Sequence, residues 1–542
     1  MINGLRRGSV ILPSRYARNL ALDTDEPVGR GNGMPQEDVI TLLSSATGHP
    51  GGGPVEIVET HGAIIFLAGE VALKIKRDVT YDYMDLSTLA LREAMLRREL
   101  ALNQPFAPMI YRDVVAVTRE PNGTLAFDGE GEPVEWVLRM WRFPKEAELA
   151  VIADRHGIDD NLAHDLGEAL FRFHAQASHR DADGAALIGD ILDELDRVFA
   201  GMHDALGSER IAAFSQAARV EWRRVSPLLR KRAEDGHVRR CHGDLHLRNI
   251  VLLDGVPVPF DALEFDEVLG TCDVLYDLAF LLMDLNRRGL TRAANIVLAA
   301  YLLEAGGTED SGLATLPLFL AVRSAIHAMV AVQTSTATHT APGAEPMNTL
   351  DNARNFLARP PAKLVVIGGL SGTGKTTIAR DVAPFIGAAP GAVHLRTDLE
   401  RKAALGLKET THAPATSYSP SARAAVYTHL FSRAEAILSA GHSVLIDATF
   451  LDPELRASVM DLGMSQDVAV QTIWLEAPLK VLINRVSMRE GDASDADETV
   501  LRAQYAGLDA PTDWQKVSAL GTPKETIERV CSALGCEQSN RR

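Results

Sequence analysis

Apolar and polar positions alternate with a period of two in the first patterned part of the chain. Between residues 55 and 76, the runs VEIVET, AIIFLA and VALKIK are separated by short glycine-containing turns, which predicts an antiparallel meander of strands. Residues 86–102 instead carry apolar side chains at helical spacing with many charges between them, so they predict an amphipathic helix. Further strand-like runs end near residue 143, and the pattern is then mostly helical up to Val332. A strand-rich lobe followed by a helix-rich lobe is therefore expected.

A different pattern begins near residue 363. The apolar runs LVVIGG, VLIDATF and TIWLEA alternate with segments of helical periodicity. Strands that alternate with helices are typical of a parallel sheet whose two faces are both covered. Between the two patterns, the segment from Thr334 to Asn348 is polar and contains Pro and Gly, so we place the junction of two domains at 349–362.

The length of the chain also favours more than one domain. It has 542 residues, whereas a single hydrophobic core stops growing at roughly 250–300 residues. Residues 1–35 show no helical or strand periodicity and are expected to form a disordered tail, with Met34 as an alternative start. The predicted domains are 36–348 and 363–535, with 349–362 as a linker and 536–542 as a C-terminal tail.

Composition limits the classes of function. The net charge of −17 repels polyanions, which argues against a large nucleic-acid interface. We expect no membrane span, because the longest apolar stretches are short and carry charge; the one from Leu313 to Val332 contains Arg323. No secretory signal is evident. The four cysteines form no CxxC pair, so we expect reduced thiols and a cytoplasmic location.

The second half contains a phosphate-binding pattern. GLSGTGKT at 369–376 fits GxxxxGK[ST] and stands between an apolar strand and a helix. Glycines let backbone N–H groups converge on phosphates, and the helix N-terminus adds positive potential. Lys375 is expected to bridge the β- and γ-phosphates of ATP during catalysis, and the Thr376 hydroxyl is expected to bind Mg²⁺. The predicted nucleotide-binding residues here are Gly369, Ser371, Gly372, Thr373, Gly374, Lys375, Thr376 and Thr377.

Two aspartates of this half are candidates for the chemistry of transfer. Asp447 ends an apolar run, so it is a candidate for holding the Mg²⁺ shell; the alternative is an aspartate that only caps a turn. Asp398 is a candidate general base for an acceptor hydroxyl, or else the N-cap of a helix that begins near Leu399. Arg401 lies about one turn further on and could steer an anionic substrate.

Two arginines suggest a lid over the nucleotide. Arg485 and Arg489 lie four residues apart on one helical face, before a polar segment. In the functional interpretation Arg485 binds the nucleotide and Arg489 stabilises the transferring phosphoryl group, while the alternative is a pair of solvated surface arginines. Together, GLSGTGKTT, HLRTDLERK, VLIDATF and the RxxxR…DASDA segment resemble the P-loop kinases grouped around gluconate kinase, polynucleotide kinase and zeta toxins, over about residues 363–510.

The first half carries a second candidate site, in HGDLHLRN at 242–249. Asp244 and Asn249 are five residues apart, the spacing of a kinase catalytic loop, in which the Asp acts on the acceptor hydroxyl and the Asn binds Mg²⁺. Asp261 follows a predicted hairpin with DG at its turn, which returns the chain to its starting point, so Asp261 can share the metal with Asn249. Asp273 and Asp277 are expected to brace this loop.

A lysine–glutamate pair should complete this site. In VALK, Lys74 is expected to reach the α- and β-phosphates, but Lys76 lies on the same face of the strand and is the alternative. Glu99 and Glu93 are both candidates for the acid that pairs with the lysine, and Glu99 is preferred. The alternative for either acid is a solvated charge on a helix surface.

These motifs resemble the aminoglycoside-phosphotransferase-like kinase family over about residues 55–333. The resemblance implies an α+β bilobal, protein-kinase-like fold with ATP in the cleft and a hinge near Met140 to Arg142. Two features depart from kinase patterns: the glycine-rich loop is reduced to the segment 60–63, and DAL replaces DFG. The whole chain resembles bacterial two-domain proteins in which such a kinase is fused to an α/β P-loop NTPase.

The resulting hypothesis is an ATP- and Mg²⁺-dependent phosphotransferase with two catalytic domains, each acting on a small-molecule hydroxyl group. Two alternatives stay open: the front domain as a nucleotide-binding regulatory pseudokinase, and the rear domain as a polynucleotide 5′-hydroxyl kinase. Neither acceptor nor the oligomeric state follows from the residues.

Overall fold

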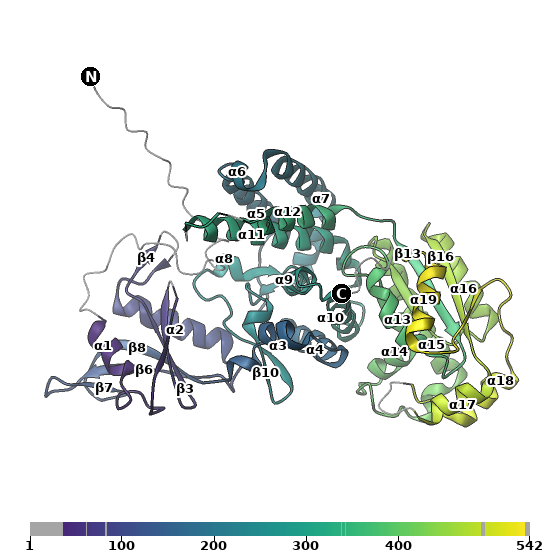
Figure 1. Ribbon diagram of the computed structural model, residues 1–542, viewed down its shortest axis with the longest axis horizontal. Coiled ribbons are helices and arrows are strands. Elements are labelled where there is room, and N and C mark those ends of the chain that lie inside the picture. The colour runs from purple at the N-terminus through teal and green to yellow at the C-terminus, as the bar shows by residue number, and fades with distance from the viewer. Residues whose placement is uncertain are drawn as a thin grey trace, which may run out of the picture. The chain divides into compact units, whose positions relative to one another are not determined.

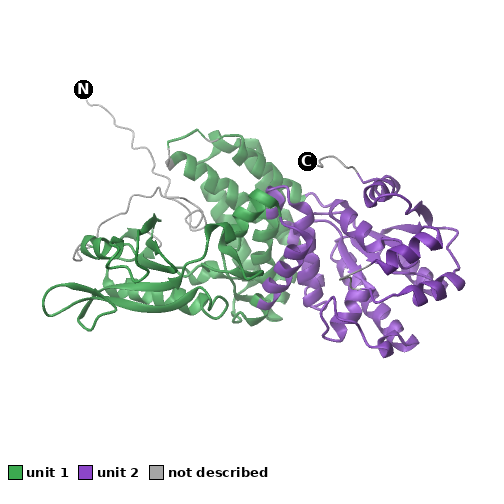
Figure 2. Cartoon of the chain, turned by 60° about the horizontal axis from the view of Figure 1, so that its bottom comes forward, with its two compact units in different colours: residues 1–157, 173–284, 318–357 green, residues 158–172, 285–317, 358–542 purple. Residues whose placement is uncertain are grey.

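A computed structural model describes residues 36–60, 62–81, 84–337, 339–341, 343–488 and 494–536. The predicted N-terminal tail lies outside these residues. The chain divides into two compact units, coloured separately in Figure 2. Unit 1 consists of Met1–Gly157, Phe173–Asp284 and Leu318–Leu357, and unit 2 of Ile158–Arg172, Leu285–Pro317 and Ala358–Arg542.

In unit 1, helix α1 (Glu37–Ser44) is followed by a six-stranded antiparallel sheet in the order β1-β2-β3-β8-β6-β7 (Figure 1). Its first three strands form the meander that the alternation predicts. Helix α2 (Leu89–Asn103) packs on the sheet, because Leu96 shares a buried cluster with Leu138 and Ala72. The strands are β1 (Glu56–Glu59), β2 (Ala63–Ala68), β3 (Val71–Lys76), β6 (Tyr111–Arg119), β7 (Leu125–Phe127) and β8 (Glu132–Trp141).

The rest of unit 1 is mostly helical, as expected, with two small strand pairs that shape the candidate site. β9 (Val238–Arg240) pairs with β12 (Thr271–Asp273), and β10 (Ile250–Leu253) pairs with β11 (Val256–Pro259). Asp254 and Gly255 join the second pair at φ 50° and 80°, as a two-residue hairpin turn requires. The helices include α5 (Gly184–Phe199), α7 (Ser208–Glu234), α9 (Val274–Arg287), α11 (Leu316–Ala337) and α12 (Glu345–Leu357).

Within the described ranges, one helical stretch is long and apolar enough to cross a membrane. It runs from Asp310 to Thr336, further than the apolar stretch seen in the sequence, and 89% of its most apolar window is buried inside the protein. Arg323 lies within it and is itself buried. This stretch is therefore packed as a core helix.

Unit 2 contains a five-stranded parallel sheet in the order β14-β15-β13-β16-β17. Ile367 on the sheet packs with Ile378 of α13 (Lys375–Val382) and Val530 of α19 (Pro523–Leu534). The predicted parallel sheet with covering helices is confirmed. The strands are β13 (Lys363–Gly369), β14 (Val393–Arg396), β15 (Val444–Asp447), β16 (Ala469–Glu476) and β17 (Gln515–Ser518). The helices that follow β14 in unit 2 include α14 (Thr397–Ala404), α15 (Pro420–Ser439), α16 (Pro453–Ser465), α17 (Leu479–Ser487) and α18 (Glu498–Ala506).

Two segments from before residue 349 belong to unit 2. Asn295, on α10 (Thr291–Glu304), donates a hydrogen bond to the carbonyl of Ala392 at 3.0 Å. The buried Arg433 pairs with Asp310 at 2.9 Å. Packing thus groups Ile158–Arg172 and Leu285–Pro317 with the parallel sheet. The domains expected from the sequence, 36–348 and 363–535, remain a prediction.

Candidate active sites

The phosphate-binding pattern forms a tight turn between β13 and α13. Gly369, Gly372 and Gly374 have φ values of 142°, 82° and 87°, a region that residues with a Cβ rarely enter. A Cβ at Gly369 would lie 2.5 Å from the Leu475 carbonyl oxygen. Within the loop, the Thr373 hydroxyl donates to the Leu370 carbonyl at 2.8 Å. This geometry explains why the pattern needs glycine at these positions.

We expect Gly369→Ala to lower the affinity of unit 2 for nucleotide by at least about tenfold. The new methyl group would have to displace backbone atoms of β16, and the positive φ would cost about 1–3 kcal/mol in addition. Gly406→Ala is the matched control: its φ is 65°, but a Cβ there meets no atom within 4 Å. Titration with a fluorescent ATP analogue would measure the effect, and equal affinities for both variants would contradict it.

Lys375, Thr376 and Asp447 converge beside this loop. The Thr376 hydroxyl donates to Oδ2 of Asp447 at 2.5 Å, and Nζ of Lys375 donates to the Leu370 carbonyl at 3.1 Å. Burial alone would raise the pKa of Asp447, but the interactions with His394 and Lys375 outweigh it and lower this pKa to about 2. The carboxylate is therefore ionised at neutral pH. One hydroxyl and one carboxylate are hard oxygen ligands, so these residues fit a Mg²⁺ ion.

The acceptor-side candidates form an ion pair of their own. Asp398 lies in the first turn of α14, and its Oδ1 accepts a hydrogen bond from Arg401 at 2.6 Å. The Arg401 guanidinium also stacks on the Tyr418 ring at 4.5 Å. Its charge is thus already compensated by Asp398, which weakens the expectation that Arg401 steers an anionic substrate. The helix N-cap is Arg396, so Asp398 is not the N-cap residue.

Of the two candidate lid arginines, the structure describes only Arg485. Arg485 lies on α17, and it donates to the Ala519 carbonyl at 2.9 Å. Arg489 lies outside the described residues.

Most of the predicted residues of this site line one cavity of about 1140 Å³. It is lined by Ser371, Gly372, Gly374, Lys375, Thr376, Thr377, Asp398, Asp447 and Arg485, among others.

In unit 1, the HGDLHLRN segment folds into a compact loop. The Asn249 amide donates to both the backbone carbonyl and Oδ2 of Asp244, each at 3.0 Å. The N–H of Phe260 donates to the Asn249 carbonyl, so the hairpin does bring the residue before Asp261 back to Asn249. Asp261 has φ 60°, and its N–H donates to the Tyr111 hydroxyl at 3.0 Å.

Lys74 and Lys76 both reach Glu99. Nζ of Lys74 lies 2.7 Å from Oε1 of Glu99, and Nζ of Lys76 lies 2.7 Å from Oε2. Lys74 also contacts Oδ1 of Asp261 at 3.0 Å, and Lys76 contacts Glu264 at 2.6 Å. The structure therefore joins the two lysine alternatives through one glutamate. The other acid candidate, Glu93, instead pairs with Arg97 on the helix surface.

Electrostatics hold this cluster in its charged form. Burial alone would lower the pKa of Lys74, but the negative charges of Asp261, Glu99 and Glu264 raise it well above the usual value. Burial would raise the pKa of Asp261, yet Lys74 lowers it. Each group thus keeps its charge because its partners are present.

Asp277 braces the loop, as the sequence predicts. Its carboxylate accepts the backbone N–H groups of His242 and Gly243 at 2.9 and 3.0 Å, and it lies 3.2 Å from His174. Burial would raise its pKa, but the hydrogen bond with His174 and the nearby positive charges lower it to about 2. Asp273, by contrast, pairs with Arg232 at 2.7 Å.

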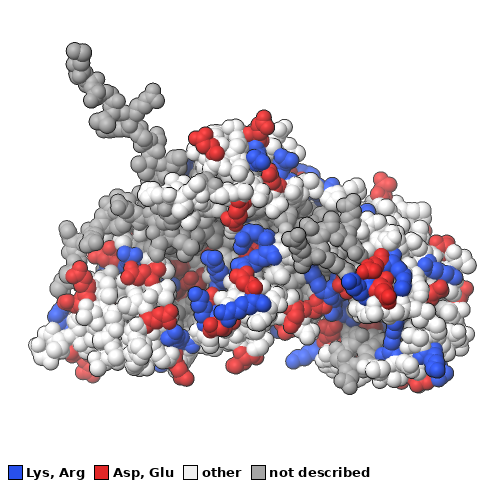
Figure 3. All heavy atoms as spheres, viewed as in Figure 1, with Lys and Arg blue, Asp and Glu red and all other residues white. Residues whose placement is uncertain are grey.

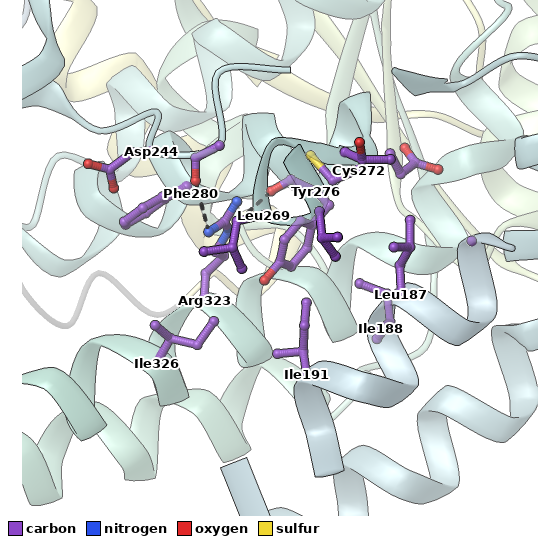
Figure 4. Close-up of a pocket in the computed structure, with 15 residues that line it drawn as sticks. Leu187, Ile188, Ile191, Asp244, Leu269, Cys272, Tyr276, Phe280, Arg323 and Ile326 are labelled. Atoms are coloured by element: carbon purple, nitrogen blue, oxygen red, sulfur yellow. Dashed lines mark hydrogen bonds between the residues drawn. The ribbon is translucent and has the colours of Figure 1, made fainter. Parts of the chain in front are cut away.

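The buried Arg323 contacts the HGDLHLRN loop at Gly243. Figure 4 shows Arg323 beside the rings of Tyr276 and Phe280, which lie 4.0 and 4.6 Å from its guanidinium carbon. One of its nitrogens donates to the Gly243 carbonyl at 3.4 Å. The cavity next to it is small, only about 30 Å³. In the sequence, Arg323 stands out only as a charge that interrupts an apolar run, and no pattern there indicates its contact with Gly243.

Comparisons with known proteins find two different families along the chain. Residues 90–313 match the phosphotransferase enzyme family, and residues 364–511 match the AAA domain family. An uncharacterized protein of Mycobacterium tuberculosis (strain ATCC 25618 / H37Rv) is 29% identical over 489 residues, which are 87% of this chain and 93% of the relative.

Two solved structures are similar to parts of the chain. A choline/ethanolamine kinase family protein from Mesorhizobium loti is 15% identical and covers 60% of this chain and 95% of its own, with a TM-score of 0.34. A gluconokinase from Sinorhizobium meliloti is 18% identical and covers 32% of this chain and 92% of its own, with a TM-score of 0.25. The family matches support the two-domain organisation indicated by the sequence motifs: an earlier region of the chain is similar to the phosphotransferase enzyme family and a later region is similar to the AAA domain family.

Proposed function

We propose that both units transfer the γ-phosphate of Mg·ATP to hydroxyl groups of small molecules in the cytoplasm. The observation that carries the proposal is the convergence of Lys375, Thr376 and Asp447 at a glycine turn in front of a helix. Backbone N–H groups and a lysine at such a turn suit a triphosphate, and the hydroxyl–carboxylate pair suits Mg²⁺. The free cysteines of the described residues are consistent with a reducing compartment.

In unit 2, each candidate residue would have a separate role in phosphoryl transfer. Lys375 would neutralise charge that builds up on the transferring group, and Thr376 and Asp447 would hold Mg²⁺, which supplies further positive charge when bound. Asp398 would accept or orient the proton of the acceptor hydroxyl. In its present ion pair, Asp398 is held in place by Arg401.

In unit 1, Asp244 would act on the acceptor hydroxyl, while Asn249 and Asp261 would hold the metal. Lys74, oriented by Glu99, would bind the α- and β-phosphates. Asn249 is already hydrogen-bonded to Asp244, which fixes the relation between the base and one metal ligand. The donor set of amide and carboxylate oxygens again fits Mg²⁺.

One observation favours a regulatory, non-catalytic role for unit 1. Lys74 contacts Asp261 directly at 3.0 Å, so a metal or phosphate that engages either residue has to compete with this ion pair. A polynucleotide 5′-hydroxyl kinase in unit 2 is less well supported, because acidic and basic side chains are interspersed on the face shown in Figure 3.

A single experiment separates these possibilities. Wild type, Lys375→Ala and Asp244→Asn are each incubated with Mg·ATP and a library of metabolites, and new products are followed by mass. We expect Lys375→Ala to abolish one phosphorylated product and Asp244→Asn to reduce another. A product set that neither variant changes would contradict the proposal. Loss of product only in Lys375→Ala, with unit 1 still binding ATP, would identify unit 1 as the regulatory alternative.

A further inference from the structure

In unit 2, the carboxylate of Asp495 accepts three hydrogen bonds and lies near one histidine. The carboxylate lies 2.7 Å from the Tyr418 hydroxyl, 2.9 Å from the backbone nitrogen of Ala413 and 3.1 Å from Nζ of Lys402. Nδ1 of His412 lies 3.2 Å away. Asp495 precedes α18, whereas the donors come from α14 and from the segment between α14 and α15. One carboxylate therefore ties together two segments that are far apart in the chain.

The ammonium of Lys402 is buried, so it needs the negative charge of Asp495. Lys402 is only 1% exposed, and its ammonium otherwise contacts the Glu409 carbonyl at 2.8 Å. A buried ammonium is costly unless an opposite charge compensates it. Asp495 supplies that charge, since its side chain is only 11% exposed. Segment 409–418 is thus held at the Glu409 carbonyl by Lys402, and at Ala413 and Tyr418 by hydrogen bonds to Asp495.

Direct contacts connect Asp495 to Asp398, the carboxylate on the acceptor side. Tyr418, which donates to Asp495, carries the Arg401 guanidinium over its ring at 4.5 Å. Arg401 in turn donates to Asp398 at 2.6 Å. Asp398, Arg401, Tyr418 and Asp495 all line the same cavity as Lys375. A shift of the segment that carries Tyr418 would therefore move the support of Asp398.

We propose that Asp495 is a positioning residue, which fixes the acceptor-side pair Asp398–Arg401 by holding segment 409–418 through Tyr418 and Ala413 and helix α14 through Lys402. The proposal rests on the proposed kinase function of unit 2. Asp495 touches neither reacting group; it acts through Tyr418 and Arg401. Small errors in the placement of a catalytic group cost up to about 100-fold in rate, so loss of these contacts should reduce turnover without preventing nucleotide binding.

The test combines hydrogen exchange with kinetics on the full chain. In Asp495→Asn, amides in peptides that cover residues 408–419 should exchange at least about tenfold faster, because the amide leaves one acceptor oxygen where the carboxylate has two, and it no longer compensates the charge of Lys402. With Mg·ATP and the metabolite library, the kcat of the Lys375-dependent product should fall between about 10- and 100-fold, while the KM for ATP stays within about twofold. Tyr418→Phe keeps the ring under Arg401 and removes only the hydroxyl, so it should give a smaller fall in kcat.

Asp461→Asn, at an exposed acid on α16, is the matched control and should change neither readout. Unchanged exchange at 408–419 in Asp495→Asn overturns the proposal, and so does a rise in the KM for ATP that accounts for the whole loss of rate. If Asp495→Asn does not fold, Tyr418→Phe decides by the same two readouts. Failure of the kinase function itself is seen separately, as a product set that Lys375→Ala leaves unchanged.

Discussion

Replacing Glu99 by alanine is expected to lower the free energy of unfolding of unit 1 by about 3–5 kcal/mol. Glu99 is fully buried and neutralises two lysines at once, each at 2.7 Å. Removing one partner of a buried ion pair leaves the remaining charge without compensation, and here Asp261 and Glu264 alone would have to balance Lys74 and Lys76. Thermal or urea unfolding followed by circular dichroism would measure the change.

Glu93→Ala is the control for this prediction. Glu93 lies on the same helix but pairs with Arg97 at the surface, where an ion pair contributes less than about 1 kcal/mol. The loss in Glu99→Ala should be constant from pH 6 to 9. The pKa of Lys74 is raised, so its stabilisation is fully present below the unfolded value near 10.5 and is lost only as the pH rises through the folded value. Equal unfolding midpoints for the two variants would refute the central role of Glu99.

The sequence predicted those parts of the two sites that lie close together in the chain. The turn 369–376 and the Asp244–Asn249 loop depend on backbone geometry within a few residues, and glycines or fixed spacing reveal such geometry. The alternation of VALK also predicted that Lys74 and Lys76 share a face. It could not decide between them, because both side chains turn toward the same buried acid.

The partners that lie far apart in the chain were missed. Glu264 pairs with Lys76 across 188 positions, and Asp495 pairs with Lys402 across 93. A lone charged residue in a loop carries no pattern that distinguishes such a partner from a solvated one. The only available signal for Asp495 was its place in a polar segment, which the sequence assigned to a lid. Likewise, the guanidinium of Arg485 contacts the Ala519 carbonyl, a direction that spacing on a helix does not define.

Replacing Asp447 by asparagine is expected to lower turnover by unit 2 about 100- to 1000-fold, the cost of removing one preorganised charged group from a transfer site. The substitution keeps the size of the side chain but removes its charge, so Lys375 loses an opposite charge and Thr376 loses the strong acceptor 2.5 Å away. A carboxylate also binds Mg²⁺ better than an amide. The Mg²⁺ concentration for half-maximal rate should therefore rise, and a Mg²⁺ titration of the Lys375-dependent product would measure this.

The pH dependence separates this effect from a change in proton transfer. The pKa of Asp447 is lowered to about 2, so the carboxylate stays ionised from pH 5 to 9, and its contribution to stability is lost only as the pH falls through the folded value. The rate ratio between wild type and Asp447→Asn should therefore be constant over that range. Asp509→Asn, which removes an exposed ion pair with Arg456, should leave rate and Mg²⁺ requirement unchanged. A ratio that varies with pH would mean that Asp447 titrates during turnover, which the lowering of its pKa by His394 and Lys375 argues against.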